Sequence, residues 1–565
     1  MSWGWARTVL KWFDAKYGAT DRHIARWLFL RSLGLIYFSA FYCLLFQILG
    51  LVGPDGIFPA QGYLAAVARQ LPAQRYWFAP TVLWISSGPH MLMALCWVGM
   101  VASILVVLNV WPRATLIVCF ICFLSFIAAA SRFADYQSDG MLLEAGFISL
   151  FFVPGGFWPK WGERSMPSRA SLFLLQWEWF RIYFESGVVK LASGDPEWRH
   201  LTAMDQYYQN GPLPTWIGWY VQHLPHGFQT ATVIATFALE LGVVWLLFFP
   251  RRFRIVGFFI STAFQIGIIL TGNYAFLNYI VLALGFLLLD DPFLAHFVPA
   301  RWRPAPPAIP VEVEQRDGVA DSLLRLNVSP PAPESFAQED SPDESDAPLQ
   351  RGGMHPARLW LRSLAVAVAT VILAWILYAG TLPLIQMFWR GVPLPEWPVA
   401  AISPFRIANQ YGLFAVMTRH RYQMEFQGSD DGKTWTAYPF RYAPQSIYAP
   451  PGIYAPYQPR FDWNLWFASL GTWTQYPIVP RTEVQLLRGS PAVLSLFAAD
   501  PFHGEPPRQV RAVLWQYWFT TMKEKRETGQ WWRREFLGTY APTLQMEPDG
   551  RIAIVAEPTL QGPQQ

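Results

Sequence analysis

The chain has 565 residues, of which 53% are hydrophobic and 15% carry a charge. Soluble domains carry about 25% charged residues, so this shortfall predicts a large lipid-facing surface and excludes an ordinary soluble protein. Aromatic residues make up 17% of the chain, and their rings favour the interface between a bilayer and water. The net charge of +4 comes without a block of Lys and Arg. We therefore expect the lipid bilayer as a partner and no nucleic acid.

The N-terminal segment predicts a helix that lies on the membrane surface. Large apolar residues from Trp5 to Tyr17 recur at helical spacing, with Arg7, Lys11 and Lys16 between them. This pattern is typical of a helix on an anionic membrane face and not of a signal peptide. A short cap on the first membrane helix explains the pattern equally well.

Apolar runs of about 20 residues can cross a bilayer as helices, and the sequence holds about nine candidates. Seven are clean runs, near residues 32–52, 91–111, 114–131, 230–249, 255–272, 274–290 and 363–386. Two others are less clean, because 140–154 is short and 171–191 is interrupted by charge. Lys and Arg are concentrated in the N-terminal arm and in alternate loops, which predicts that these parts face the cytoplasm. An odd number of crossings then places the chain after about residue 387 on the opposite side.

These features divide the chain into four parts. We expect a multi-helix membrane domain with the interfacial helix in residues 1–300, a linker in 301–357, a last membrane helix in 358–390 and a β-rich extracytoplasmic domain in 391–565. The linker is rich in proline, acidic residues and serine, so it has too little apolar surface to offset the entropy lost on ordering. We therefore predict that it is a disordered cytoplasmic loop.

The C-terminal part changes to the periodicity of strands. Residues 422–427 alternate between apolar and polar, and Asp431-Gly432 predicts a tight turn into the next strand. Further strands are expected at 483–488, 492–498, 508–520 and 551–555, with a short helix at 461–470. Scattered proline and the lack of a long amphipathic helix favour a β-sandwich.

The sequence carries no pattern for a metal, a cofactor or a disulfide framework. The cysteines lie inside apolar segments, at Cys43, Cys96, Cys119 and Cys122. The last two form a C-x-x-C pair, but no histidine or acidic residue lies near it, so packing is the favoured interpretation. We expect no cofactor and no metal site.

The charged residues within segment 171–191 are the first candidates for a functional site. Glu178, Arg181, Glu185 and Lys190 lie in sequence that otherwise spans, and charge at membrane depth is costly and often functional. Spacings of three and four place the first three on one helical face, so Arg181 can pair with either carboxylate. Such a cluster also serves as a structural lock between helices.

Other polar residues within apolar sequence can complete an intramembrane cluster with that segment. Glu240 and Asn273 belong to the predicted cluster, and Asp139 and Glu144 are further candidates. A lone carboxylate such as Glu240 in mid-helix must be protonated or paired, and Lys190 and Arg181 are its natural partners.

Short motifs along the chain resemble the lipase maturation factor family. They are Arg31–Phe41, Gly50–Pro59, Lys190–Met204, Gly211–Thr215, Thr271–Tyr274, Tyr411–Phe414, Gly428–Gly432 and Gln458–Trp463. The best-known members help secreted dimeric lipases reach their active fold in the endoplasmic reticulum membrane. The resemblance implies a membrane-anchored folding and maturation factor, chaperone-like rather than enzymatic, with a secreted, lipase-like client. The absence of cysteine from the outer part suits a bacterial inner-membrane member.

The same resemblance assigns two groups of residues to function. The family-motif loop comprises Gly194, Asp195, Trp198, Thr202 and Met204. The candidates for contact with a client are Gln458, Arg460, Asp462, Trp463 and Trp466.

A fainter resemblance leaves a second function open. The stretch from Tyr183 to Leu191, followed by Trp198, looks like a stretch of the vitamin K-dependent carboxylase membrane domain, where the matching lysine is the base that acts on a quinol cofactor. This implies Lys190 as the catalytic residue of a membrane enzyme with a quinone-like or lipid substrate. A buried Lys190 without an acid beside it favours that alternative, whereas an ion-paired Lys190 counts against it.

Overall fold

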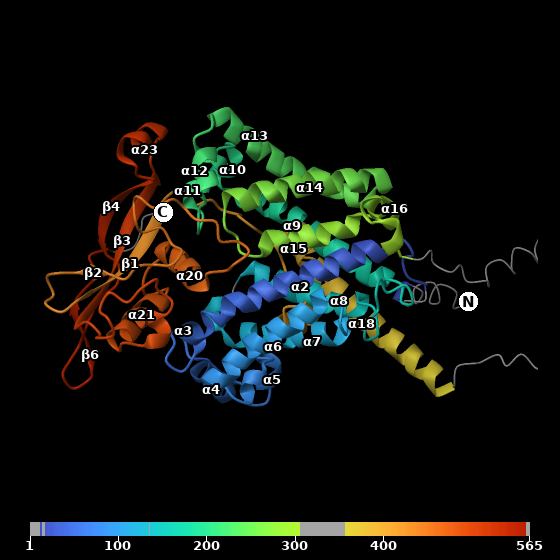
Figure 1. The fold of residues 1–565 in the computed structure, drawn as a ribbon, viewed down its shortest axis with the longest axis horizontal. Helices are drawn as coiled ribbons and strands as arrows, with labels where there is room; N and C mark the ends of the chain where they lie inside the picture. Colours follow the sequence, from blue (N-terminus) through green and yellow to red (C-terminus); the bar gives the residue numbers. More distant parts are fainter. Residues whose placement is uncertain (1–11, 14–16, 135, 305–355, 561–565) are drawn as a thin grey trace, which may run out of the picture.

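The fold joins a long bundle of helices to a small antiparallel sheet at one end of the bundle (Figure 1). The computed structural model describes residues 12–13, 17–134, 136–304 and 356–560. The predicted interfacial N-terminal helix and the predicted linker therefore lie almost entirely outside the described residues.

Six helices of the described chain are long and apolar enough to cross a membrane. They are α2 (His23–Leu45), α6 (Pro89–Val107), α7 (Pro112–Ala129), the continuous run His226–Phe248, α14 (Arg251–Thr271) and Ser363–Phe388 within α18 (Pro356–Phe388). The run His226–Phe248 consists of α13 (His226–Phe237), the π-helical turn η4 (Ala238–Gly242) and the 3-10 helix η5 (Val243–Phe248). A seventh span is Leu277–Leu288 together with Asp291–Phe297, if this pair, bent by 100°, is counted as one.

The nine predicted crossings are not confirmed. Two of the helices concerned are too short or too highly charged to count as candidate spans. α8 (Gln137–Phe152) has only 16 residues, and α9 (Arg169–Ala192) carries the four charges already noted. Both are largely buried and pack on each other and on α15 (Leu277–Gly285). They form the interior of the bundle, which the lipid-facing helices surround.

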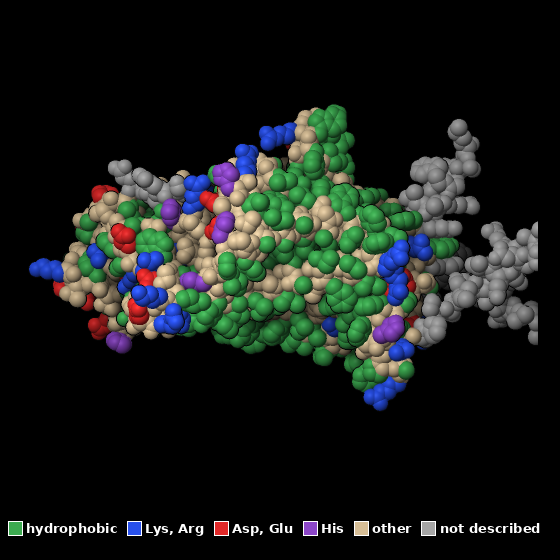
Figure 2. Space-filling model, turned by 90° about the horizontal axis from the view of Figure 1, so that it is seen from above, with side chains coloured by type: hydrophobic (Ala, Val, Ile, Leu, Met, Phe, Trp, Pro, Cys, Tyr) green, Lys and Arg blue, Asp and Glu red, His purple; other side chains and the backbone are tan. Residues whose placement is uncertain are grey.

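The two ends of the bundle differ in chemistry. α7, α9 and α14 each have a basic residue at their first or second position, namely Arg113, Arg169 and Arg251. These helix starts and the start of α18 lie at the end of the bundle farthest from the sheet (Figure 1). Figure 2 shows hydrophobic side chains over the middle of the bundle and charged side chains at both of its ends.

The start of α2 is joined to a short helix near the end of the membrane part. The first amide groups of a helix lack partners within it. The Asp291 carboxylate accepts two of them, from His23 and Ile24, each at 2.8 Å. Asp291 opens the short helix α16 (Asp291–Leu294), so this cap ties α16 to α2.

Short helices form the loops between the long ones. They are α3 (Ile48–Val52), α4 (Ala60–Gln70), α5 (Arg75–Phe78), η2 (Val82–Trp84), η3 (Ser131–Ala134), α10 (Pro196–Arg199), α11 (Met204–Asn210), α12 (Trp216–Gln222), η6 (Phe286–Leu288), η7 (Ala295–Phe297), η8 (Ala300–Trp302), α19 (Trp397–Ile402) and η9 (Ser403–Phe405). α10, α11 and α12 lie on the side of the bundle that faces the sheet (Figure 1).

The C-terminal domain is built on one six-stranded antiparallel sheet. Its strands are β1 (Arg421–Ser429), β2 (Thr436–Ala437), β3 (Gln509–Phe519), β4 (Trp532–Thr539), β5 (Thr543–Met546) and β6 (Ile552–Ala556). The order is β2-β1-β3-β5-β6, and β4 pairs with the second half of β3. The predicted turn at Asp431-Gly432 joins β1 to β2: Gly432 has φ of +69°, and the Asp431 carboxylate accepts the N–H groups of Lys433 and Thr434.

The predicted β-sandwich is wrong, because the described residues form a single sheet with helices beside it. The predicted strand 483–488 lies in α21 (Ile478–Leu487), and 492–498 overlaps α22 (Pro491–Leu494). α21 buries its apolar side against β3, while the expected helix at 461–470 is α20 (Arg460–Ser469), which packs on β1. α23 (Met522–Thr528) follows β3 and begins with a capping box made by Thr521 and Glu524.

Candidate functional site

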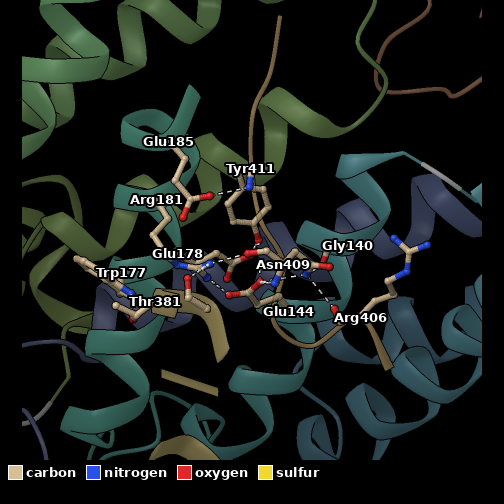
Figure 3. Close-up of polar contacts among 11 residues, drawn as sticks. Gly140, Glu144, Trp177, Glu178, Arg181, Glu185, Thr381, Arg406, Asn409 and Tyr411 are labelled. Atoms are coloured by element: carbon tan, nitrogen blue, oxygen red, sulfur yellow. Dashed lines mark hydrogen bonds and ion pairs between the residues drawn. The ribbon is translucent and has the colours of Figure 1, made fainter. Parts of the chain in front are cut away.

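A buried polar cluster surrounds Arg181 in the interior of the bundle (Figure 3). Its members come from α8, from α9 and from the chain that follows α18. They are Glu144, Glu178, Arg181, Glu185, Asn409 and Tyr411, with the backbone of Gly380. The cluster therefore joins segments far apart in the sequence.

Arg181 is held from three sides. Its guanidinium forms an ion pair with Glu144 and donates to the carbonyl oxygens of Gly380 at 3.0 Å and Asn409 at 2.7 Å. A Cβ at position 380 would come within 2.9 Å of the guanidinium carbon, so glycine permits this close approach. The contact fastens α18 and the segment after it to α9.

The carboxylates of the cluster bind the segment around Tyr411. Glu144 Oε2 accepts the Asn409 backbone N–H at 2.8 Å and the Tyr411 hydroxyl at 2.8 Å. Glu185 accepts the Tyr411 backbone N–H at 2.6 Å. Buried carboxylates are expensive unless they are hydrogen-bonded, so these bonds make the cluster a lock that holds residues 409–411 within the bundle.

Among the carboxylates expected near Arg181, the one that pairs with it is Glu144, one of the further candidates. Glu178 and Glu185 lie three and four residues away on its own helix, but the ion pair is made with Glu144 of α8. Neighbouring side chains on one helix run side by side, whereas Glu144 approaches from the facing helix and meets the guanidinium directly.

Lys190 and Glu240 form a second buried pair. The Lys190 ammonium lies 2.8 Å and 2.9 Å from the two oxygens of Glu240, and its nitrogen is 5.3 Å from the centre of the Trp198 ring. Glu240 sits in η4, and π-helical turns often mark functional sites. The predicted pairing of Glu240 is confirmed, and it counts against Lys190 as a catalytic base.

A cavity of about 360 Å³ lies beside this pair. α9, α11, α12, α13 and α14 contribute most of its walls, and Lys190 and Glu240 stand at one end of it. The wall side chains are mainly apolar, among them Met204, Phe228 and Phe264. The cavity thus has one polar end and an apolar body.

The family-motif loop packs on the chain that follows the cluster. Asp195 accepts the Glu197 N–H at 2.9 Å and the Met417 N–H at 2.5 Å. The Trp198 indole donates to the Phe414 carbonyl at 3.0 Å. Gly194 has φ of +77°, where a side chain is strained. Thr202 and Met204 complete the loop: the Thr202 hydroxyl donates to Glu197 at 2.6 Å, and buried Met204 lines the cavity.

Asn273 lies apart from the cluster in which it was predicted. Its amide donates to the carbonyls of Leu213 at 3.1 Å and Gly452 at 2.9 Å. Its oxygen accepts the N–H of Tyr454 at 2.6 Å. Asn273 therefore binds a loop of the C-terminal domain to the end of the bundle that faces the sheet.

The residues predicted to contact a client lie instead at the joint between the domains. Gln458, Arg460, Asp462 and Trp463 are buried, and Trp466 is half-buried with its indole N–H on the Asn210 carbonyl at 3.1 Å. Their motif begins α20, which carries them into the interface with the bundle. In this conformation a client cannot reach the four buried side chains.

Asp462 is a buried carboxylate of this joint. It accepts the N–H groups of Ala443 at 2.9 Å and Tyr442 at 3.3 Å, and burial raises its pKa to about 6.

The sequence analysis missed three side chains that hold the parts of the protein together, two in the cluster around Arg181 and one at the joint between the domains. Asn409 and Tyr411 enter the cluster, and the signal for Tyr411 was its place in the motif Tyr411–Phe414. Arg421, at the start of β1, donates to the carbonyls of Gln209 at 3.1 Å and Pro212 at 3.2 Å, and burial lowers its pKa to about 9. Nothing in the strand pattern marked Arg421.

Comparison with known proteins covers both parts of the chain. Residues 24–296 match the family model described as the lipase maturation factor transmembrane domain, and residues 407–542 match that of the lipase maturation factor C-terminal domain. Lipase maturation factor 2 of Gallus gallus is 32% identical over 609 aligned positions, which cover 95% of this chain and 82% of the relative. The Homo sapiens protein of that name is 29% identical, covering 93% and 83% of the two chains. Lipase maturation factor 1 of Bos taurus is 27% identical, covering 95% and 91%. No solved structure matches the chain.

Proposed function

Because this chain belongs to the lipase maturation factor family, we propose that it is a membrane-anchored folding and maturation factor with a lipase-like client. The names of its relatives suggest the class of client, and the position of the sheet on the bundle supports a role in presenting it. The bundle is the anchor, and the C-terminal domain is the part that the client meets.

The observation that carries this proposal is the rigid attachment of the sheet to the bundle. Three buried contacts support it: Arg460 with Asp139, Arg421 with the loop 209–212, and Asn273 with the loop 452–455. Each joins a polar side chain to a partner in the other domain, so bending the joint would leave a buried polar group unpaired. The sheet is thereby held at a fixed position at one end of the bundle.

A free edge of this sheet is the surface we assign to the client. Within the described residues β6 pairs with β5 alone, and Ile554 and Val555 are 56% and 47% exposed. An unpaired edge strand offers its backbone groups to another chain, and extended segments commonly bind by adding a strand. An incompletely folded apolar segment of the client fits this edge.

The proposed topology has nine crossings, with α8 and α9 as the two interior spans. α9 has 24 residues, or about 36 Å at helical rise, which is enough to cross a bilayer of about 30 Å. The basic helix starts lie at the end away from the sheet, which supports a cytoplasmic linker and an extracytoplasmic C-terminal domain. We assign the chain to a bacterial inner membrane.

Co-expression with a secreted lipase tests the proposed function. A photoreactive benzoyl-phenylalanine at position 554 should crosslink to the lipase during its folding, and Ile554→Lys should reduce secreted lipase activity several-fold at equal abundance of the factor. Phe536→Lys is the matched control, since Phe536 is 49% exposed on β4. Equal loss in both variants, or secretion independent of the factor, would refute the proposal.

A further inference from the structure

The cavity beside Lys190 and Glu240 has the geometry of a ligand site. Its volume of about 360 Å³ lies within the range of about 300–1,000 Å³ that is usual for small-molecule sites. Ile217 and Phe228 line it from α12 and α13, and Ile268 lines it from α14. α13 and α14 belong to runs of which only 33% and 22% are buried within the protein. Two walls of the cavity are therefore candidate membrane helices that the rest of the protein covers only in part.

The walls of this cavity suit hydrocarbon better than water. Apolar cavities hold water poorly, because a water molecule needs two to four polar partners. Thr232 and Thr236 line the wall, but their hydroxyls donate to backbone carbonyls of their own helix at 2.9 Å and 2.8 Å. The apolar body thus offers water few free partners and suits a hydrocarbon chain.

The polar end of the cavity determines which polar head group a bound hydrocarbon chain can carry. Lys190 and Glu240 already neutralise each other, with both carboxylate oxygens on the ammonium. A carboxylate ligand would have to displace Glu240 from Lys190, which leaves a buried charge unpaired. The third ammonium N–H makes only a long contact, at 3.4 Å, with the Ser186 carbonyl oxygen. An uncharged oxygen can take its place or donate to the carboxylate while the pair stays intact.

We propose that this cavity binds a single-chain lipid that ends in an uncharged hydroxyl or carbonyl oxygen. The chain lies along the apolar walls, and the oxygen meets the Lys190–Glu240 pair. Binding needs no chemical step and no role for Lys190 as a base. The site is independent of the edge strand assigned to the client.

Photoaffinity labelling of the full-length protein in nanodiscs tests this proposal. The probe is hexadecanol that carries a diazirine and an alkyne, and a palmitic acid probe of the same design is run in parallel. Labelled peptides should come from residues 204–236 and 264–271, and excess unlabelled hexadecanol should reduce the labelling at least fivefold. Hexadecanol should label more strongly than palmitic acid.

Two glycines provide a matched pair of variants. Gly267 lines the cavity and Gly227 does not, and a Cβ built on either one meets no atom within 4 Å. Gly267→Phe places a ring in the cavity and should reduce labelling at least fivefold, whereas Gly227→Phe should leave it unchanged. Equal labelling of the two variants, labelling spread over all lipid-facing helices, or stronger labelling by palmitic acid would overturn the proposal. Competition in the unsubstituted protein decides the question should Gly267→Phe fail to fold.

Discussion

Arg460 of the C-terminal domain and Asp139 of the bundle form a two-armed ion pair, with both nitrogen–oxygen distances at 2.7 Å. Both side chains are only 1% exposed. A planar guanidinium matches a carboxylate in this arrangement, and such pairs are stronger and more specific in geometry than single contacts. The orientation of the sheet on the bundle is therefore fixed by a contact between α20 and α8.

Removing Arg460 should loosen this joint. Arg460→Ala leaves Asp139 buried without its cation, which costs about 3–5 kcal/mol in comparable buried pairs. We expect a lower melting temperature in detergent and faster proteolysis between residues 390 and 460. Arg488→Ala is the control, because Arg488 is exposed. An Arg460→Ala variant that melts with the control would show that the ion pair does not hold the domains.

In the cluster around Arg181, Tyr411→Phe should destabilise the protein less than Arg460→Ala does. This change removes the hydroxyl that donates to Glu144 at 2.8 Å and keeps the ring in place. A hydrogen bond to a charged group contributes about 1.5–3 kcal/mol, so the free energy of unfolding should fall by that amount. Tyr448→Phe, at a residue 60% exposed, should change little in the same denaturant titration. Equal effects of the two variants would contradict the lock described for residues 409–411.

Asp462 gives a pH dependence whose sign follows from its raised pKa. In the folded protein the pKa is about 6, against an ordinary value of 3.8, so the folded state binds the proton more tightly. Stability should therefore fall as pH rises from about 4 to 6, and the loss persists at neutral pH.

Asp462→Asn should remove this loss. One oxygen of Asp462 accepts the N–H groups of both Tyr442 and Ala443, and the asparagine carbonyl can replace it. We expect the variant to be more stable at pH 7.5 by roughly 3 kcal/mol and nearly unchanged at pH 4. Melting curves at the two pH values check this, and a variant less stable at pH 7.5 would contradict it.

The sequence predicted the elements that depend on local pattern. Apolar runs located the lipid-facing helices, and alternation with a turn located β1 and β2. The strands expected at 508–520 and 551–555 are β3 and β6. The prediction of a strand at 483–488 is wrong, because Val484, Leu486 and Leu487 fit the period of a strand as well as that of a helix. Packing against β3 is what favours the helix. A short apolar run does not distinguish a strand from a buried helix.

The site was predicted less fully because its partners come from distant segments. Arg181 and Glu144 lie 37 residues apart, and Arg181 and the Asn409 carbonyl lie 228 residues apart. Nothing in local spacing reports such contacts. The motif around Arg460 was recognised as a family feature and assigned to the client, but the structure uses it to join the two domains. A shared motif indicates that its residues are important. It leaves open whether they contact a partner or hold parts of the same chain together.

The pair of Lys190 and Glu240 yields the prediction that bears most on function. Lys190→Ala leaves Glu240 buried without its cation, so the abundance of the protein should fall, with a cost of about 3–5 kcal/mol by analogy with other buried pairs. Lys190→Arg should be mild, because a guanidinium keeps the charge and the pairing. The double variant Lys190→Ala/Glu240→Ala removes both charges and should recover most of the lost abundance. With Glu240→Ala as the second single variant, a double-mutant cycle measures the coupling directly.

Maturation of a co-expressed secreted lipase, measured per molecule of the factor, separates a structural pair from a catalytic one. If Lys190 acts only as the partner of Glu240, each variant should support maturation in proportion to its abundance. If Lys190 were a base, the double variant and Lys190→Arg would both be abundant and inactive, since neither carries an amine at this position and a guanidinium is a poor base at neutral pH. Ser193→Ala is the control on the same helix end, because its hydroxyl donates to the Lys190 carbonyl and leaves the ammonium untouched. Full abundance of Lys190→Ala would show that Glu240 is tolerated unpaired and would contradict the structural role.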